Sequence, residues 1–176
     1  MKNDPKHVDL RKFTTRNLVV VHWLEKLFSA FELLRRNEIR HLPVVDDSGA
    51  IIGIISDRDF QRAMQIDQPD FISGKVTQPE FDPNVRVRDF MSWPVEAIDE
   101  KRTIAEAARV MIDKRISSLI VTRNSEVVGI VTTEDMLRSL LEGSEGMIEN
   151  LKDDVRSVFY NSTVGQIANA LANAGI

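Results

Sequence analysis

The chain has 176 residues, 43% hydrophobic and 28% charged, which is enough for one good core or for two small half-domains sharing one. A formal net charge of −4 at pH 7 disfavours a broad nucleic-acid surface, because that binding depends on neutralised phosphates. The absence of cysteine excludes disulfides, thiolate catalysis and thiolate metal sites.

The chain contains an internal repeat. Residues 10–45 match residues 87–122, and after one residue is gained or lost in a turn, Gly53 and Asp59 match Gly129 and Asp135. Each copy is predicted to form a strand, a helix, two strands joined by a tight turn, and a second helix.

The first copy begins with a predicted strand, "LVVV", at residues 18–21. A helix should follow, because the apolar residues of 24–34 keep helical spacing. The runs "LPVV" and "IIGII", joined by "DDSGA", predict a hairpin. Because "IIGII" is apolar without alternation, we expect it to be covered on both faces.

The second copy carries a stronger helix start. Thr103 and Glu106 form a capping-box pattern before its first helix, whereas the first copy has Lys26 and Ser29 at these positions. We therefore expect the first helix to lack this cap. The runs "LIV" and "VVGIV", joined by "TRNSE", predict the second hairpin.

The repeats divide the chain into five predicted parts. They are a tail at 1–9, repeats at 10–65 and 87–142, a proline-containing linker at 66–86 and a C-terminal extension at 143–176. The extension is predicted to hold two helices, which either contact a target or a second subunit or cover the sheet.

The second copy, "VRDFMSWPVEAIDEKRTIAEAARVMIDKRISSLIVTRNSEVVGIVTTEDML", and the first copy from "NEIRHLPVVDDSGAIIGIISDRDF" resemble a tandem pair of cystathionine-beta-synthase (CBS) domains, or Bateman module. The resemblance implies an α+β fold of two β-α-β-β-α repeats packed with pseudo-twofold symmetry, here with the C-terminal helical extension. It also implies a regulatory module that binds AMP, ADP or ATP, and sometimes S-adenosylmethionine, in clefts between the halves. Such modules often form homodimers.

A hydroxyl and an aspartate, three residues apart, follow the last strand of each repeat: Ser56 with Asp59, and Thr132 with Asp135. One interpretation is a capping box, in which the hydroxyl accepts from a first-turn amide and the acid reaches back. The other is a nucleotide site at a helix start. By the resemblance, each aspartate would hold ribose and each hydroxyl would lie near phosphate. The two interpretations are compatible.

The two copies differ in charge around these motifs. The first has Arg40, His41 and Arg58, and the second has Ser117, Ser118 and Glu134 at the same places. Arginine favours phosphate and glutamate disfavours it, so we expect the first motif to be the better phosphate site. The second should prefer adenosine or a positively charged ligand. Arg40 and His41 are also compatible with a solvated basic turn.

The resemblance supplies the remaining positions of the two candidate sites. Trp93 is open to two interpretations, base stacking or packing at an interface. The first predicted site comprises Thr15, Asn17, Ile39, Arg40, His41, Pro43, Ser56, Arg58 and Asp59. The second comprises Ser92, Trp93, Val95, Ile116, Ser117, Ser118, Ile120, Thr132, Glu134 and Asp135.

No catalytic or metal site is expected, because His7, His22 and His41 share no metal-ligand spacing and the phosphate-binding glycine loop is missing. Without an apolar span or a signal-peptide core, the protein is expected to be cytoplasmic and not membrane-bound. We expect a stand-alone, homodimeric regulatory protein, which either acts in trans on a separate protein target or is a free-standing nucleotide sensor. The alternative is a ligand-free dimerisation module whose motifs only cap helices.

Overall fold

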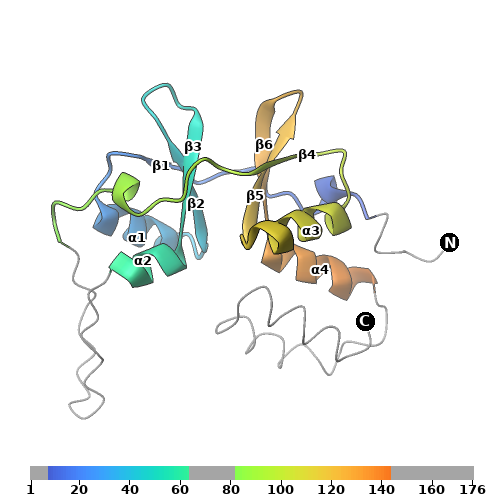
Figure 1. Cartoon of the computed structure of the whole chain (residues 1–176). Helices are drawn as coiled ribbons and strands as arrows, with labels where there is room; N and C mark the ends of the chain where they lie inside the picture. The colour runs from blue at the N-terminus through green and yellow to red at the C-terminus, as the bar shows by residue number, and fades with distance from the viewer. Residues whose placement is uncertain (1–7, 64–81, 144–176) are drawn as a thin grey trace, which may run out of the picture. The chain divides into compact units, whose positions relative to one another are not determined.

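The computed structural model describes residues 8–63 and 82–143, which form two compact units (Figure 1). The first-repeat unit is Leu18–Val95, and the second-repeat unit combines Met1–Asn17 with Glu96–Ile176. The predicted helices of the C-terminal extension, like most of the linker and of the N-terminal tail, lie outside the described residues.

The first-repeat unit has a three-stranded sheet in the order β1-β2-β3. Strand β1 runs parallel to β2, and β2 pairs antiparallel with β3. Two helices complete the unit. The elements are β1 (Val21–His22), α1 (Leu27–Arg36), β2 (His41–Val45), β3 (Ile51–Ser56) and α2 (Asp57–Ala63).

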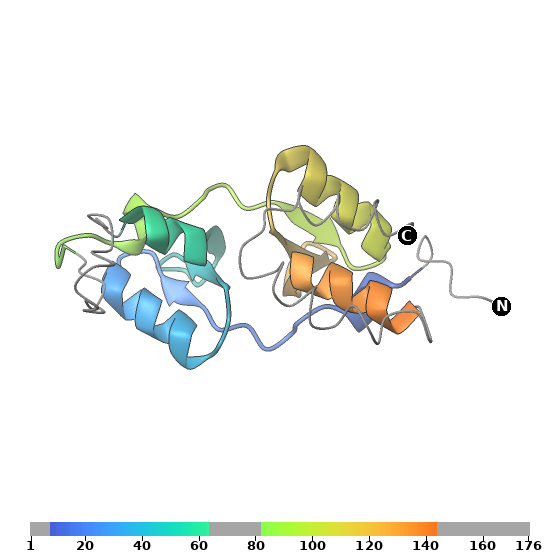
Figure 2. The ribbon, with the colours of Figure 1, turned by 90° about the horizontal axis from the view of Figure 1, so that it is seen from below.

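The second-repeat unit has the same order of elements, which confirms the predicted α+β repeat. Its sheet order is β4-β5-β6, and the helices of each unit lie side by side (Figure 2). None of the helices in the described ranges is long and apolar enough to cross a membrane. The elements are β4 (Ala97–Asp99), α3 (Ile104–Lys114), β5 (Ser118–Arg123), β6 (Glu126–Thr132) and α4 (Thr133–Gly143).

The helix starts follow the sequence prediction. Thr103 accepts from the backbone of Glu106, and the Glu106 carboxylate accepts from the backbone of Thr103, so α3 begins with a complete capping box. Helix α1 begins after Lys26, which makes no side-chain cap, as expected. It starts at Leu27, so Leu24 lies before the helix and is 40% exposed.

Two strand predictions need correction. Only Val21 of the run 18–21 belongs to β1, because the parallel ladder with β2 consists of Val21 and His22 opposite Val44 and Val45. In β3, Gly53 and Ile55 are buried while their neighbours are half-buried, so one face of the strand is covered less completely than predicted.

The opening segments of the two repeats, residues 8–17 and 87–95, are exchanged between the units. Leu10 and Phe13 are buried in the core of the second-repeat unit, although they precede the first repeat's strands. Val87 is buried in the core of the first-repeat unit in the same way. Each core is therefore completed by a segment from the other repeat.

Paired backbone hydrogen bonds fix the exchanged segments. Thr15 and Ile130 exchange two bonds of 2.9 Å, and Ser92 and Ile54 exchange bonds of 2.8 and 3.0 Å. The duplicated glycines allow this close approach. A Cβ on Gly129 would collide with the Thr15 carbonyl oxygen, and one on the equivalent glycine of β3 would lie 2.7 Å from Met91 Sδ.

We expect Gly129→Ala to lower the free energy of unfolding by about 2 kcal/mol, within the usual cost of overpacking. The added methyl meets backbone at Thr15, which cannot move without breaking its bonds to Ile130. Gly53→Ala is the matched control and should cost less, because the end of the Met91 side chain can rotate away. Urea denaturation measures both losses, and equal losses would contradict this account.

Candidate functional site

The hydroxyl–aspartate motifs have the same local geometry in both units. Oδ2 of Asp59 accepts from the Ser56 backbone N–H at 2.8 Å and from its hydroxyl at 2.7 Å. Oδ2 of Asp135 accepts from the Thr132 N–H at 2.8 Å and from its hydroxyl at 2.9 Å. The acid reaches back as the capping interpretation predicted, but each hydroxyl donates to the carboxylate rather than accepting from an amide.

The second carboxylate oxygens differ between the units. Asp59 Oδ1 accepts from Nη2 of Arg62, one turn further along α2. Asp135 Oδ1 faces Nη1 of Arg138 at 3.8 Å, beyond hydrogen-bond distance. A carboxylate oxygen is an acceptor, so the outer oxygen of Asp135 is better placed to receive hydroxyl donors than that of Asp59.

The electrostatics of Asp135 follow from this arrangement. The side chain is 5% exposed, and burial raises its pKa against the opposing effect of the bonds from Thr132. Glu134 also raises the pKa, while Arg138 lowers it. Asp135 is therefore a buried carboxylate whose charge is only partly compensated by the protein.

The basic cluster of the first motif carries less available charge than the sequence suggested. Nε and Nη2 of Arg40 both lie 3.0 Å from Asp57 Oδ2, so this arginine already has an anionic partner. Desolvation lowers the pKa of His41 to about 4, so the imidazole is neutral at pH 7. Arg58 is exposed at the start of α2. The arginines remain as cations for phosphate, but the histidine does not.

The apolar positions of the two predicted sites lie in equivalent parts of the sheets. Pro43 in β2 and Ile120 in β5 are buried, and Ile39 and Ile116 are half-buried against their cores. Ser118 is buried at the start of β5, beside Ser117. These residues frame each sheet near its motif, but the buried ones have a packing role in any case.

The opening segments sit beside different motifs from those that the sequence suggested. Thr15, predicted with Ser56 and Asp59, bonds to Ile130, two residues before Thr132. Ser92, predicted with Thr132 and Asp135, bonds to Ile54, two residues before Ser56. Asn17 and Val95 are the last residues of the exchanged segments in their units. Within each unit, the motif and its neighbouring opening segment come from different repeats.

Sequence analysis missed this exchange and also missed Arg62 and Arg138. A signal was present for both features. An arginine follows each motif aspartate by three residues, which places the two side chains on one helix face. A glycine precedes each hydroxyl by three residues, where the opposing segment approaches β3 or β6.

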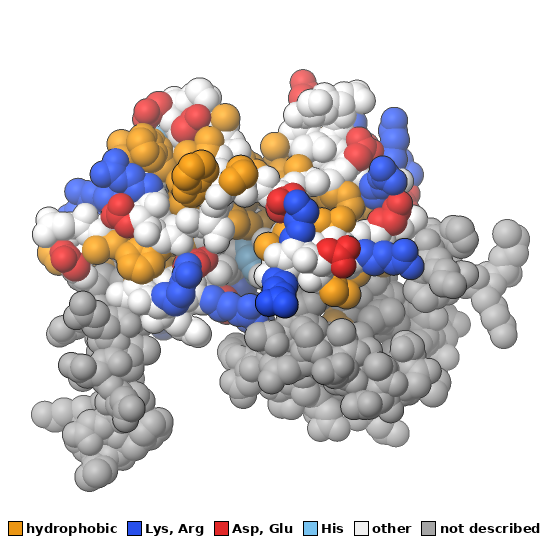
Figure 3. Space-filling model, in the orientation of Figure 1, with side chains coloured by type: hydrophobic (Ala, Val, Ile, Leu, Met, Phe, Trp, Pro, Cys, Tyr) orange, Lys and Arg blue, Asp and Glu red, His pale blue; other side chains and the backbone are white. Residues whose placement is uncertain are grey.

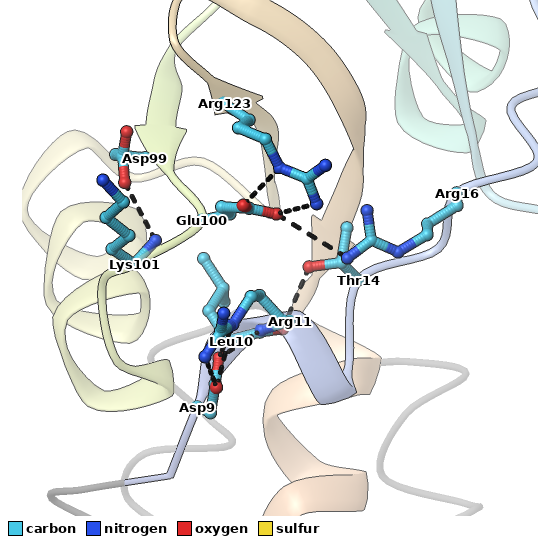
Figure 4. A network of polar contacts seen from close by, with 9 residues as sticks. All are labelled: Asp9, Leu10, Arg11, Thr14, Arg16, Asp99, Glu100, Lys101 and Arg123. Carbon is cyan, nitrogen blue, oxygen red and sulfur yellow. Dashed lines mark hydrogen bonds and ion pairs between the residues drawn. The ribbon is translucent and has the colours of Figure 1, made fainter.

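An ion-pair network anchors the opening segment 8–17, which lies in the second-repeat unit (Figure 4). Glu100 is 4% exposed and accepts from Nε and Nη2 of Arg123, the latter at 2.9 Å. Arg16 approaches the same carboxylate at 3.7 Å. The Arg123 hydrogen bonds hold the pKa of Glu100 below its usual range. The network thus joins the segment to the ends of β4 and β5.

The first-repeat unit has a cation–π contact at the equivalent place. The repeat matches Glu100 with Trp23 and Arg11 with Arg88. The Arg88 guanidinium lies over the Trp23 ring at 5.5 Å from its centroid, a cation–π contact. Among the residues described, no group of three or more His, Asp or Glu side chains is arranged to hold a metal ion.

Comparisons with known proteins agree with this architecture. The family model for the CBS domain matches residues 10–66 and 87–142. The uncharacterized protein MJ1404 of Methanocaldococcus jannaschii is 30% identical over 150 residues, covering 82% of this chain and 35% of that protein. The uncharacterized protein MK0525 of Methanopyrus kandleri is 33% identical over 106 residues, 60% of this chain and 48% of that protein. The chain spans less than half the length of both relatives.

Among solved structures, the crystal structure of CBSX2 in complex with AMP is similar, with a TM-score of 0.61 and 25% identity. The similarity covers 77% of this chain and 97% of that one. Both repeats and their order are therefore shared with a tandem pair.

We expect Asp135→Asn to keep or raise the melting temperature at pH 7, because asparagine still accepts from Thr132 without a buried charge. The raised pKa of Asp135 means that the wild type loses stability as the pH rises above 3.8, and the variant should lack this loss. Asp59→Asn is the control and should lower the melting temperature, since it weakens the pair with Arg62. Equal decreases at pH 7 would contradict this explanation.

We expect the stability of the protein to fall between pH 6.5 and about 4 because of His41. The unfolded chain binds a proton in this range while the folded imidazole stays neutral, at a total cost of about 3 kcal/mol. The groups that face His41 are Asp57, Asp59, Arg40 and Arg58. Urea denaturation from pH 7 to pH 5 should show a smaller slope in His41→Gln, and an unchanged slope would refute the assignment.

Proposed function

The chain belongs to the CBS domain family, and on that basis we propose that it is a regulatory CBS pair that binds an adenosine-type ligand. The observation that carries the proposal is the duplicated buried aspartate, whose Oδ2 is held by Ser56 or Thr132. A carboxylate fixed through one oxygen presents the other to vicinal hydroxyls, as a ribose requires. The AMP complex of CBSX2, a relative in structure, supports the same ligand class.

The two motifs would favour different ligands. Asp135 has an outer oxygen beyond hydrogen-bond distance of Arg138, with Glu134 on the next residue, so it suits the ribose of adenosine or of the cationic S-adenosylmethionine. At Asp59, a ribose must displace Arg62 or share the carboxylate with it. A released Arg62, together with Arg58, then favours a ligand that carries phosphates, such as AMP, ADP or ATP.

The ligand would regulate by binding one conformation or assembly of the protein more tightly than another, because only differential affinity shifts a population. We propose a homodimer that acts on a separate protein target. Catalysis is not part of the proposal, in which each motif holds a ligand through a carboxylate that is fixed by the neighbouring hydroxyl.

A second candidate function is a ligand-free dimerisation module. The observation that favours it is the apolar surface of the first-repeat unit, where hydrophobic side chains lie between charged ones (Figure 3). Val20, Leu24 and Phe28 are 39%, 40% and 49% exposed. Under this alternative, the hydrogen bonds of Asp59 and Asp135 only terminate β3 and β6 and start the following helices.

Calorimetric titration with AMP, ADP, ATP and S-adenosylmethionine tests the proposal. We expect Asp135→Ala to weaken S-adenosylmethionine at least tenfold, and Asp59→Ala to weaken ATP more than Asp135→Ala does. Asp113→Ala, an exposed carboxylate on α3, is the control and should change neither affinity. Thermal shift gives an independent readout, because a ligand at a hundredfold excess over its Kd stabilises the folded state by about 2.7 kcal/mol.

Two results would count against the proposal. If the wild type binds none of the four ligands and its melting temperature does not move, the dimerisation module is the better explanation. If the two aspartate variants lose ATP equally, binding stands but the ranking of the two motifs is wrong.

A further inference from the structure

The carboxylate of Asp57 holds Arg40 in the first-repeat unit. Nε and Nη2 of Arg40 both lie 3.0 Å from Asp57 Oδ2, and the backbone N–H of Asp57 donates to the Arg40 carbonyl at 3.1 Å. The guanidinium is thus directed at a carboxylate oxygen in the way that it would bind a phosphate oxygen. Asp57 is not among the residues that the sequence predicted for the first site.

We propose that Asp57 competes with the phosphate of a ligand for Arg40, and thereby sets how much negative charge a ligand needs to bind at the first motif. The inference rests on the proposed function and adds to it a residue that determines specificity. A nucleotide with a doubly charged phosphate or a longer phosphate chain replaces Asp57 at Arg40. Adenosine carries no phosphate and leaves the ion pair in place.

The ion pair lies beside the motif that is proposed to hold the ribose. His41 follows Arg40 and is opposite Ser56 in the antiparallel pair of β2 and β3. The hydroxyl of Ser56 donates to Asp59. The charges of Asp57, Asp59 and Arg40 all affect the pKa of the intervening histidine. The two carboxylates and the arginine therefore belong to one cluster of charges at the first motif.

The ion pair costs little to break. The side chains of Arg40 and Asp57 are 39% and 29% exposed, and pairs that are this accessible to water contribute little to the stability of the folded state. A phosphate dianion attracts a guanidinium more strongly than a carboxylate with one charge does. A ribose bound at Asp59 also gives its phosphate a high effective concentration near the arginine. The exchange of partners therefore favours a phosphorylated ligand.

The second-repeat unit lacks this competition. The repeat matches Arg40 with Ser117 and Asp57 with Thr133, so neither partner of the ion pair is present there. The backbone contact is kept, since the Thr133 N–H donates to the Ser117 carbonyl at 3.0 Å. The shared fold thus supplies the backbone contact, and the competition for phosphate is confined to the first motif.

Removing the charge of Asp57 tests the inference, because the expected result is a gain of affinity. Calorimetric titrations in an Asp135→Ala background confine binding to the first motif. We expect Asp57→Asn to strengthen the binding of AMP and ATP about fivefold and to leave that of adenosine unchanged. Asparagine keeps an acceptor for the backbone N–H of Arg58, so the start of α2 is retained. If Asp135→Ala does not fold, the same comparison is made in the wild-type background.

Two controls identify the cause of the gain. Glu32→Gln makes the same change of net charge in another ion pair of this unit, in which Glu32 lies 3.6 Å from Arg36, and it should leave the ATP affinity unchanged. Arg40→Ala should weaken ATP by itself. Asp57→Asn should then strengthen ATP by less than about twofold in the Arg40→Ala background, because no arginine is left to release.

The outcomes distinguish this inference from the proposed function. If ATP binds and Asp57→Asn leaves its affinity unchanged or weakens it, the competition is refuted and the nucleotide site stands. An equal gain for adenosine would also refute it, because adenosine has no phosphate to exchange. If the gain is the same with and without Arg40, the carboxylate only repels the phosphate and the inference is wrong. If AMP, ADP, ATP and S-adenosylmethionine all fail to bind the wild type, both proposals fall together.

Discussion

The two pairs of backbone hydrogen bonds, Thr15 with Ile130 and Ser92 with Ile54, are the constraint on which the rest of the structure depends. They hold the opening segment of each repeat against the last strand of the other. The bonds require close approach of two backbones, which glycine permits and a side chain at Gly129 would obstruct. They also bring the opening segment close to the motif aspartate, so the same contact that completes a core also frames the candidate site.

Around this shared backbone, the two units have diverged in charge. One aspartate is paired with Arg62, whereas its counterpart, Asp135, keeps a raised pKa in a buried setting. The opening segment 87–95 is held by the contact of Arg88 with the Trp23 ring. The opening segment 8–17 is held by Arg16, which together with Arg123 lies against Glu100. A duplicated fold thus presents two electrostatically different candidate sites, so a single ligand need not suit both.

The sequence predicted those features that depend on local spacing. The hairpins and the capping box at Thr103 follow from residues a few positions apart, and the structure has them. The repeat follows from a direct match of two stretches of sequence, and the structure has it too. The exchange of opening segments depends on long-range pairing, which a pattern within one repeat cannot reveal. The lowered pKa of His41 does not follow from its neighbours in the sequence, because it arises from desolvation in the folded protein. For the candidate sites, the sequence placed each motif after the last strand of its repeat, as the structure has it, but not the opening segment that lies beside that strand.

The burial of Leu10 and Phe13 in the second-repeat unit bears on the ancestry of this chain. Neither repeat contains all of the residues that fill its own interior. Two separate copies of a single repeat would have to exchange their opening segments between molecules, as in a domain-swapped dimer. The present protein has the topology of such a dimer joined into one polypeptide, which supplies both exchanged segments.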